Sequence, residues 1–161
     1  MTATLDAKDL RRALGHFVTG VTVVTTRCLQ GSLQGITANS FSSVSLDPPL
    51  VLVSVARTLS SFQHFRSCNA FAVHLLGDDQ RDISNRFAAR GSDKWAGIDV
   101  GEGVDGIPLL PNRLGLFECK LHATHDGGDH EILIGRVVRY DVAPETPPLV
   151  FFKGAYRSIS L

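Results

Sequence analysis

The stretch GITANSFSSVSLDPPLVLVSVARTLSS, residues 35–61, carries the signal that decides the fold. Its apolar run from Leu50 to Ala56 is short and continuous, and it follows the turn-forming residues Asp47-Pro48-Pro49. A run of this length between turn signals is typical of a fully buried β-strand. The stretch therefore predicts a strand at the centre of a β-rich core.

Further strands are predicted on both sides of this run. Residues Val21 to Thr26, VTVVTT, are β-branched, and such side chains fit a pleated sheet better than a helix. The turn Gln30-Gly31-Ser32 leads into a second strand, Leu33 to Ala38. Four more segments have strand character: Phe71 to Leu76, Leu116 to Thr124, Glu131 to Val142 and Leu149 to Phe152.

Helical patterns are fewer and shorter. An amphipathic helix with Asp6 at its N-cap is predicted from the apolar stripe of Leu10, Ala13, Leu14 and Phe17. Two short helices are expected next, one carrying Phe62 and Phe65 after a Ser60-Ser61 cap, and one carrying Ile83 and Phe87 after an Asp78 cap. The segment from Gly91 to Pro111 is rich in Gly, Asp and Pro, which favours a long surface loop.

These elements define the expected fold class. About seven strands with two or three peripheral helices favour a mainly β protein, a closed or nearly closed antiparallel barrel, over a parallel sheet of βαβ units. The chain has 161 residues, close to the usual size of one domain, and no internal repeat or linker divides it. We expect a single domain over residues 1–161.

Composition excludes several classes of protein. Hydrophobic residues make up 43% of the chain, charged residues 20%, and the formal net charge is zero, so neither a disordered acidic tail nor a nucleic-acid-binding protein is indicated. No apolar run approaches the roughly 20 residues of a membrane span. Cys28, Cys68 and Cys119 share no CxxC spacing, and no apolar signal region precedes Gly15, so we expect reduced thiols in the cytoplasm.

Motifs of hydrolysis, metal binding and nucleotide binding are missing from the sequence. It contains no HExxH, no GxSxG elbow, no Walker loop and no GxGxxG turn. His122 and His125 lie three apart at the end of a predicted strand and would point to opposite faces, so we expect no shared metal.

Three segments carry chemistry-bearing residues. The first, Gly35 to Ser45, places Thr37, Ala38, Asn39 and Ser40 in an apolar neighbourhood, where small side chains would let a planar ligand approach backbone N–H and C=O groups. The alternative for these residues is a Ser/Thr-rich edge strand or turn. The second, Ser54 to Ser61, combines hydroxyls, Arg57 and a helix start, which suits a phosphate. Its alternative is a plain helix cap with a solvated arginine.

The third segment is Asp126 to Glu131, a glycine-containing hairpin followed by a strand. Asp129 can accept a hydrogen bond from Nδ1–H of His130 and fix its tautomer, which leaves the other ring nitrogen to face a ligand. The alternative is a polar hairpin tip. Near the end of the sequence, Lys153 to Arg157 can either meet an anionic dinucleotide or simply finish the domain. Thr19 and Ser84 offer further hydroxyls, with no pattern that assigns them to a site.

Taken in order, these segments resemble the flavin reductase family with the FMN-binding split barrel. The resemblance covers about residues 10 to 157 and rests on eight pieces: FVTGVTVVT (17–25), GITANSF (35–41), SVSLDPPLV (43–51), FAVHLL (71–76), RFA (86–88), DKWAG (93–97), GGDH (127–130) and GAY (154–156). His74 stands where an Asn is common in the family, and Trp95 where a Phe is common. Both departures concern contact details more than the reaction.

The resemblance implies a set of binding residues. Thr37, Ala38, Asn39 and Ser40 would contact the isoalloxazine of FMN or FAD, and Lys94 would lie near the flavin tail. His130 would position the nicotinamide of NADH or NADPH, with Gly154 and Tyr156 nearby. The ribityl and phosphate would be lined by Ser54, Ala56, Arg57, Thr58, Ser60 and Ser61.

The family also implies an activity and partners. Its members are homodimeric NAD(P)H:flavin oxidoreductases that often supply reduced flavin to a monooxygenase. Hydride passes directly between the two cofactors, which explains why no catalytic triad is needed. The alternatives are a flavin-binding module without turnover and a related oxidase acting on a substrate such as a pyridoxine phosphate. The His130 hairpin and Tyr156 favour the enzyme, because a flavin carrier would not need a second ligand site.

Overall fold

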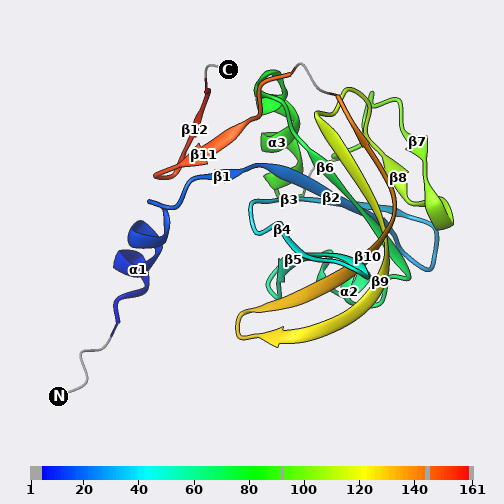
Figure 1. Ribbon diagram of the computed structural model, residues 1–161, viewed down its shortest axis with the longest axis horizontal. Helices are drawn as coiled ribbons and strands as arrows, with labels where there is room; N and C mark the ends of the chain where they lie inside the picture. Colours follow the sequence, from blue (N-terminus) through cyan, green and yellow to red (C-terminus); the bar gives the residue numbers. More distant parts are fainter. Residues whose placement is uncertain (1–4, 92, 144–145, 160–161) are drawn as a thin grey trace.

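The computed structural model describes residues 5–91, 93–143 and 146–159. Its centre is a seven-stranded antiparallel sheet (Figure 1) with the strand order β3-β2-β6-β9-β10-β5-β4. The strands are β2 (Thr22–Arg27), β3 (Leu33–Ala38), β4 (Ser42–Leu46), β5 (Pro49–Ala56), β6 (Ala70–Leu75), β9 (Gly115–Gly127) and β10 (His130–Val142). The prediction of a mainly β antiparallel fold is confirmed.

The sheet curls until its two edges approach each other. Strands β3 and β4 lie at opposite edges of the sheet, yet only the connection from Asn39 to Phe41 separates them in sequence. The hydroxyl of Ser40 bridges the gap, since it accepts a hydrogen bond from the backbone N–H of Ser54 (2.9 Å) and donates to the carbonyl of Ser54 (3.1 Å). The result is a barrel with one open seam.

Smaller elements surround this barrel. A second sheet has the order β1-β11-β12, built from β1 (Thr19–Gly20), β11 (Val150–Phe152) and β12 (Ala155–Arg157). A third pairs β7 (Gly101–Glu102) with β8 (Pro108–Leu109). The helical elements are α1 (Ala7–Leu14), α2 (Phe62–Arg66), α3 (Arg81–Ala88) and the 3-10 turns η1 (Asp78–Gln80) and η2 (Val104–Gly106).

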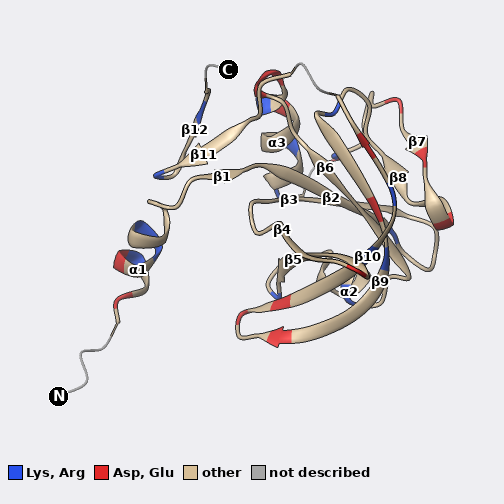
Figure 2. Cartoon of the chain, viewed as in Figure 1, with Lys and Arg blue, Asp and Glu red and all other residues tan. Residues whose placement is uncertain are grey.

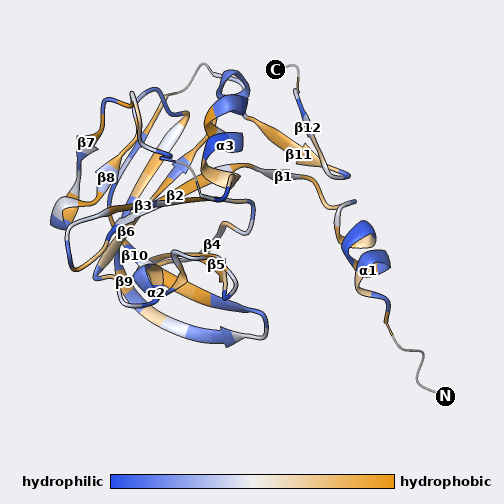
Figure 3. Ribbon diagram, turned by 180° about the vertical axis from the view of Figure 1, so that it is seen from behind, coloured by the Kyte–Doolittle hydropathy of each residue, from blue (hydrophilic) through white to orange (hydrophobic). Residues whose placement is uncertain are grey.

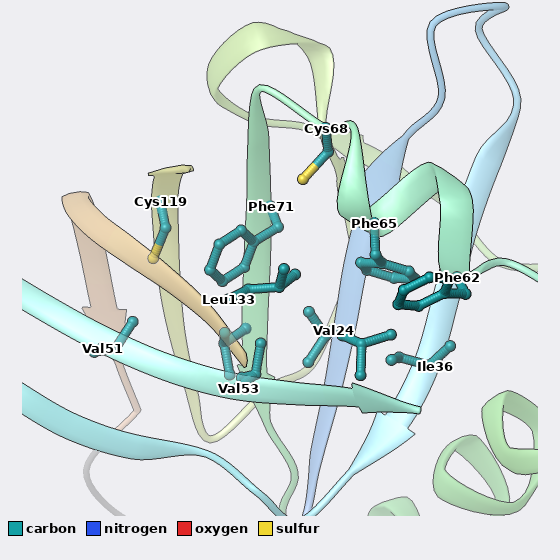
Figure 4. Packing of buried hydrophobic residues seen from close by; sticks show 12 residues of the cluster. Val24, Ile36, Val51, Val53, Phe62, Phe65, Cys68, Phe71, Cys119 and Leu133 are labelled. Atoms are coloured by element: carbon teal, nitrogen blue, oxygen red, sulfur yellow. The ribbon is translucent and has the colours of Figure 1, made fainter. Parts of the chain in front are cut away.

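The barrel is filled by aliphatic and aromatic side chains from most of its strands. Phe71 of β6 lies at its centre, with Val24, Val53 and Leu133 around it and Phe65 of α2 closing one end (Figure 4). A Cβ on Gly135 would lie 2.5 Å from the Phe71 ring, so only glycine lets β10 pack this closely on the ring. The alternating burial of β5 follows from strand geometry: Val51, Val53 and Val55 face this core.

Several local predictions need correction. Ser42–Leu46 forms the edge strand β4, which the sequence had offered only as an alternative to a ligand wall. Asp78 begins the turn η1, and the N-cap of α3 is Gln80, so Asp78 does not cap that helix. Ser61 occupies the N-cap of α2, but its side chain makes no capping hydrogen bond.

The long strands and the long loop also differ from expectation. Strands β9 and β10 extend further than predicted, because pairing continues to Gly127 and His130 at the turn. His122 is the extra residue of a bulge in β9, so the simple alternation behind its predicted orientation does not hold there. The segment from Gly91 to Pro111 is mostly irregular, as predicted, apart from β7, η2 and β8; Ser92 lies outside the described residues.

Helix α1 stands off from the barrel (Figures 1 and 3). Its N-cap is as predicted, with the Asp6 carboxylate accepting from the backbone N–H of Asp9 at 2.8 Å. The predicted apolar stripe is not buried, however: Leu10, Leu14 and Phe17 are 46%, 65% and 77% exposed. The stripe therefore has no partner within the described part of the chain. No helix among the described residues is long and apolar enough to cross a membrane.

His74 ties the irregular loop to the barrel wall. Its imidazole is fully buried, its Nδ1 lies 3.0 Å from the carbonyl oxygen of Val23, and its Nε2 accepts from the N–H of Leu110 at 3.1 Å. This pair of bonds requires the neutral ring with its proton on Nδ1. Burial accordingly lowers the pKa of His74 from 6.5 to about 4.

This shift predicts an acid-labile contribution to stability. The unfolded chain takes up the His74 proton near pH 6.5 and the folded chain only near pH 4, so stability is fully present above pH 6.5 and falls as pH drops through that window. The shift corresponds to about 3 kcal/mol. We expect the stability difference between wild type and His74→Asn, measured by urea unfolding, to shrink by about this amount between pH 7 and pH 4. A difference that stays constant with pH would contradict this assignment.

Candidate functional site

The wall predicted to hold a planar ligand lies where β3 passes into β4. Thr37 and Ala38 end β3, and Asn39 and Ser40 form the connection. Two of the hydroxyls are used within the protein, because Thr37 donates to the carbonyl of Ser84 at 2.6 Å and Ser40 bridges to Ser54. A ligand at this wall would therefore contact mainly backbone groups, Asn39 and small side chains. The hydroxyls of Thr37 and Ser40 are already used within the protein.

Two cavities meet at this wall. One, of about 220 Å³, is lined by Thr37, Ala38 and Asn39 together with Ser84 and Tyr156. The other is an open groove of about 570 Å³, lined by Asn39, Ser40 and Phe41 and by the segment 17–22. Both cavities are lined by Asn39 and Val21, so they adjoin.

Thr19 adds a polar atom to the larger groove. Its Oγ1 is buried and has no hydrogen-bond partner in the described structure. A buried hydroxyl without a partner costs free energy on the order of 1–3 kcal/mol, so such an atom is rarely left unpaired in a complete assembly. We therefore expect a polar group of a ligand or of another chain to bind in this groove and to pair with Thr19 Oγ1.

Tyr156 belongs to this wall and not to the His130 hairpin. Its hydroxyl lies 2.7 Å from Ser84 Oγ and donates to Asn85 Oδ1 at 3.1 Å, and its ring packs edge-on against Phe151. Strand β12 and the β9–β10 turn lie apart, with β12 beside β11 and the turn on the other side of β4 and β5 (Figure 1). Within one chain, the structure therefore separates Tyr156 from His130, which the resemblance had grouped together.

The segment expected to line a phosphate begins on the outer face of β5. Ser54 and Ala56 alternate with the core valines, so both face away from the core. Thr58 and Ser60 are exposed in the turn after β5, and Ser61 is half-buried at the start of α2. Their three hydroxyls form no hydrogen bond with the described residues, which leaves them available to a ligand.

Arg57 has a larger structural role than its sequence context suggests. Its Nε donates to the carbonyl of Gly128 (3.0 Å), Nη1 to Glu131 Oε2 (3.2 Å) and Nη2 to Asp126 Oδ1 (2.7 Å). Its backbone N–H donates to the carbonyl of Asp129 at 3.0 Å. Arg57 thus binds residues on both sides of the β9–β10 turn. Two of the five N–H donors of its guanidinium form no hydrogen bond with the described residues.

Glu131 completes this clamp and was not singled out from the sequence. Its carboxylate is 7% exposed and lies within 3.2 Å of Arg57 Nη1 and 3.6 Å of Arg66 Nε. A buried carboxylate needs such partners, because an unpaired charge at this depth is strongly destabilising. The only sequence signal was an acidic residue at a strand start, which is common on any hairpin.

His130 follows the turn that Arg57 holds. Its Nδ1 lies 2.6 Å from Asp129 Oδ1, which confirms the predicted pairing. The hydrogen bond from His130 is the main cause that lowers the pKa of Asp129. With Nδ1 held by Asp129, the neutral ring presents Nε2 as an acceptor, and its side chain is 42% exposed.

Backbone contacts place Lys94 beside α3 and β3, and Gly154 beside α1. The Lys94 ammonium donates to the carbonyls of Phe87 (2.7 Å) and Gly35 (3.2 Å), and partial burial lowers its pKa. It joins the end of α3 to β3 at Gly35, and the next residue of β3, Ile36, packs in one core cluster with Phe62 of α2 (Figure 4). Gly154 lies in the β11–β12 turn beside α1, with φ +75°.

Among residues that the sequence left unassigned, Ser84 now has a clear place. It is fully buried on α3, and it contacts both Thr37 and Tyr156. Only the three-dimensional meeting of β3, α3 and β12 reveals this, since the three residues are far apart in sequence.

Comparison with known proteins gives this arrangement a context. Residues 14–160 match the model of the flavin reductase like domain. The chain is 43% identical over 155 residues to the FMN reductase (NADH) SmoA of Agrobacterium fabrum. This alignment covers 96% of the present chain and 87% of SmoA. It is 42% identical over 156 residues to the reductase component of the flavin-dependent trigonelline monooxygenase of Acinetobacter baylyi, covering 97% of this chain and 50% of that one.

A solved structure agrees with the sequence comparison. The NADH:FAD oxidoreductase SgcE6 of Streptomyces globisporus, in complex with NAD and FAD fragments, superposes with a TM-score of 0.89 at 36% identity, covering 99% of this chain and 98% of that one. The present chain spans about half the length of some curated relatives that it matches. The family match over nearly the whole chain, together with the curled antiparallel sheet, establishes that this chain belongs to the flavin reductase family of the split-barrel type.

Proposed function

We propose that this chain is an NAD(P)H:flavin oxidoreductase that reduces FMN or FAD and supplies the reduced flavin to a monooxygenase. The single observation that carries this is the pair of adjoining cavities at the Thr37–Ser40 wall. Relatives support the direction of the chemistry, since SmoA is named an FMN reductase that uses NADH, and the Acinetobacter relative is the reductase component of a monooxygenase.

The residues present fit a flavin. A backbone-rich wall suits the pyrimidine edge of its ring, and the unpaired Thr19 hydroxyl offers a further polar contact. The free hydroxyls of Thr58, Ser60 and Ser61 and the two remaining donors of Arg57 suit a phosphate. Ser54 and Ala56 would line the path between the two. Lys94 would act indirectly, by holding β3 against α3.

The reaction needs little acid–base chemistry from the protein. The bound cofactors supply direct hydride transfer from nicotinamide C4 to flavin N5. The chain's own task is to hold two rings in contact and exclude water. His130, with its tautomer set by Asp129, would accept a hydrogen bond from the nicotinamide side. Tyr156 lines the cavity at the Thr37–Ser40 wall and Gly154 lines the cleft beside α1, so we assign them to those two places.

A homodimer would cover surfaces that are exposed in the single chain. We infer that a second copy covers the apolar stripe of α1 and the groove beside segment 17–22. Leu14 and Phe17 are 65% and 77% exposed, and exposed apolar side chains that gather at one place commonly mark an interface. We also propose that residues 1–161 form a single domain and that the protein works in the cytoplasm, where its three unpaired cysteines stay reduced.

The activity is tested by mixing the purified protein with NADH or NADPH and with FMN or FAD, in all four combinations, and following the loss of reduced-nicotinamide absorbance. We expect flavin-dependent oxidation with at least one combination, and faster turnover with NADH, the donor named for two relatives. Absence of oxidation in every combination would exclude the reductase function.

The role of His130 is tested by His130→Ala. Loss of one positioning hydrogen bond of about 1 kcal/mol should lower kcat/KM for NADH by roughly five- to tenfold, mainly through KM, and leave flavin affinity unchanged. Arg57→Ala should act in the same direction, because it releases the turn that carries His130. The matched control is His125→Ala, an exposed histidine of the same hairpin. Unchanged NADH kinetics in His130→Ala would refute the assignment.

The dimer is tested by Leu14→Ser combined with Phe17→Ser. Neither side chain is buried in the single chain, so the variant should fold while sedimenting as a monomer. Flavin affinity should fall with the loss of the second copy. A control pair on the exposed face of α3, Asp82→Ser with Arg86→Ser, should leave the sedimentation unchanged. If wild type itself sediments as a monomer, the homodimer proposal is wrong.

A further inference from the structure

Helix α1 turns its cationic face toward its own chain and its apolar stripe outward. Lys8, Arg11 and Arg12 share one face of the helix, opposite Leu10 and Leu14. These three side chains and His16 line one side of a cleft of about 530 Å³. The other side is the β11–β12 turn, where Lys153 lies (Figure 2).

The cleft is strongly positive in a chain whose formal net charge is zero. Arg12 pairs with Asp9 at 2.5 Å. Lys8, Arg11 and Lys153 form no ion pair with any described residue. The Lys153 ammonium lies over the ring of Phe152, 5.3 Å from its centroid. Cations gathered around one cleft produce a positive potential there, which favours entry of an anion.

The conformation of the β11–β12 turn holds Lys153 beside the cleft. Lys153 and Gly154 are its two central residues and have φ values of +50° and +75°. Turns with positive φ at both central positions strongly favour Asn, Asp or Gly at the first, so lysine carries a conformational cost there. The turn is tied to the helix end, because the N–H of Lys153 donates to the carbonyl of Gly15 at 2.8 Å.

The cleft also lies within electrostatic reach of the His130 hairpin. The charge of Arg11 contributes, as a minor cause, to the lowered pKa of Asp129. Helix α1 and the β9–β10 turn, which carries Asp129 and His130, lie on the same side of the molecule (Figure 1). A ligand that spans the two would be held by His130 at one end and by the cations of α1 at the other.

We propose that this cleft binds the diphosphate of an adenosine diphosphate group. The cations of Lys8, Arg11 and Lys153 suit two adjacent phosphates, and the volume exceeds what a diphosphate alone fills, which leaves room for a nucleoside. Two molecules of the proposed reaction carry this group, the nicotinamide dinucleotide and FAD, whereas FMN lacks it. The identity of the ligand, a nicotinamide dinucleotide or FAD, rests on the proposed function. That the ligand is an anion with two phosphates is argued from the cleft alone.

The binding test uses ADP and the full chain, without any turnover. Calorimetric titration of wild type should give saturable binding that weakens as KCl is raised, because the contacts are ionic and exposed. The variant Arg11→Gln with Lys153→Gln should bind ADP about tenfold more weakly. The matched control is Arg90→Gln with Arg136→Gln, which removes two exposed, unpaired cations elsewhere and should bind like wild type. Absence of ADP binding, or equal weakening in both variants, would overturn the proposal.

The kinetic arms identify which molecule uses the cleft. With FMN as acceptor, the double variant should lose kcat/KM for NADH about tenfold but keep its activity with reduced nicotinamide mononucleotide, if the nicotinamide dinucleotide binds there. If FAD binds there, the loss should appear with FAD and not with FMN. ADP binding without a loss in either arm would overturn the assignment to the reaction. A chain with no activity at all would refute the proposed function, while the ADP titration would still decide the cleft.

Discussion

Strands β3 and β4 are consecutive in the chain yet form opposite edges of one seven-stranded sheet, so the sheet has to curl until those edges meet. The connection from Asn39 to Phe41 is the bridge, and the two hydrogen bonds between Ser40 and the backbone of Ser54 hold it. The curl leaves a seam along which backbone groups lack the strand pairing that a closed barrel would give them. The candidate flavin wall is that seam, so the site follows from how the barrel fails to close.

The second part of the site depends on a different kind of interaction. The β9–β10 turn projects beyond the barrel, and three donors of Arg57 with the buried carboxylate of Glu131 hold it against the end of β5. Through this clamp, the segment expected to bind a phosphate and the hairpin that carries His130 become one unit. The guanidinium therefore has two tasks, and most of its hydrogen-bonding capacity is already committed to the protein. The free hydroxyls of Thr58, Ser60 and Ser61 must then contribute more of any phosphate binding than sequence reasoning assigned to them.

Much of the fold was predictable, because burial and strand pairing leave local signatures. The β-branched run of β2 and the apolar run of β5 were sufficient to predict strands, and Asp6 was sufficient to predict the start of α1. The edge strand β4 was harder, since SSVSL carries little apolar signal and its pairing with β5 is a tertiary event. For the site, the Asp129–His130 pair could be foreseen because the two residues are adjacent. The bonds of Thr37 to Ser84, of Lys94 to Phe87 and Gly35, and of Arg57 to Glu131 could not, because they join segments that only the curled sheet brings together.

The most direct test of this account is a crystal structure of the protein grown with FMN, and its decisive measurement is the position of the flavin in the difference density. The account predicts the isoalloxazine against Thr37 to Ser40 along the seam, with the phosphate beside Thr58 to Ser61 and the free donors of Arg57. A flavin bound instead in the cleft between α1 and the β11–β12 turn, or between α3 and the irregular loop, would contradict it.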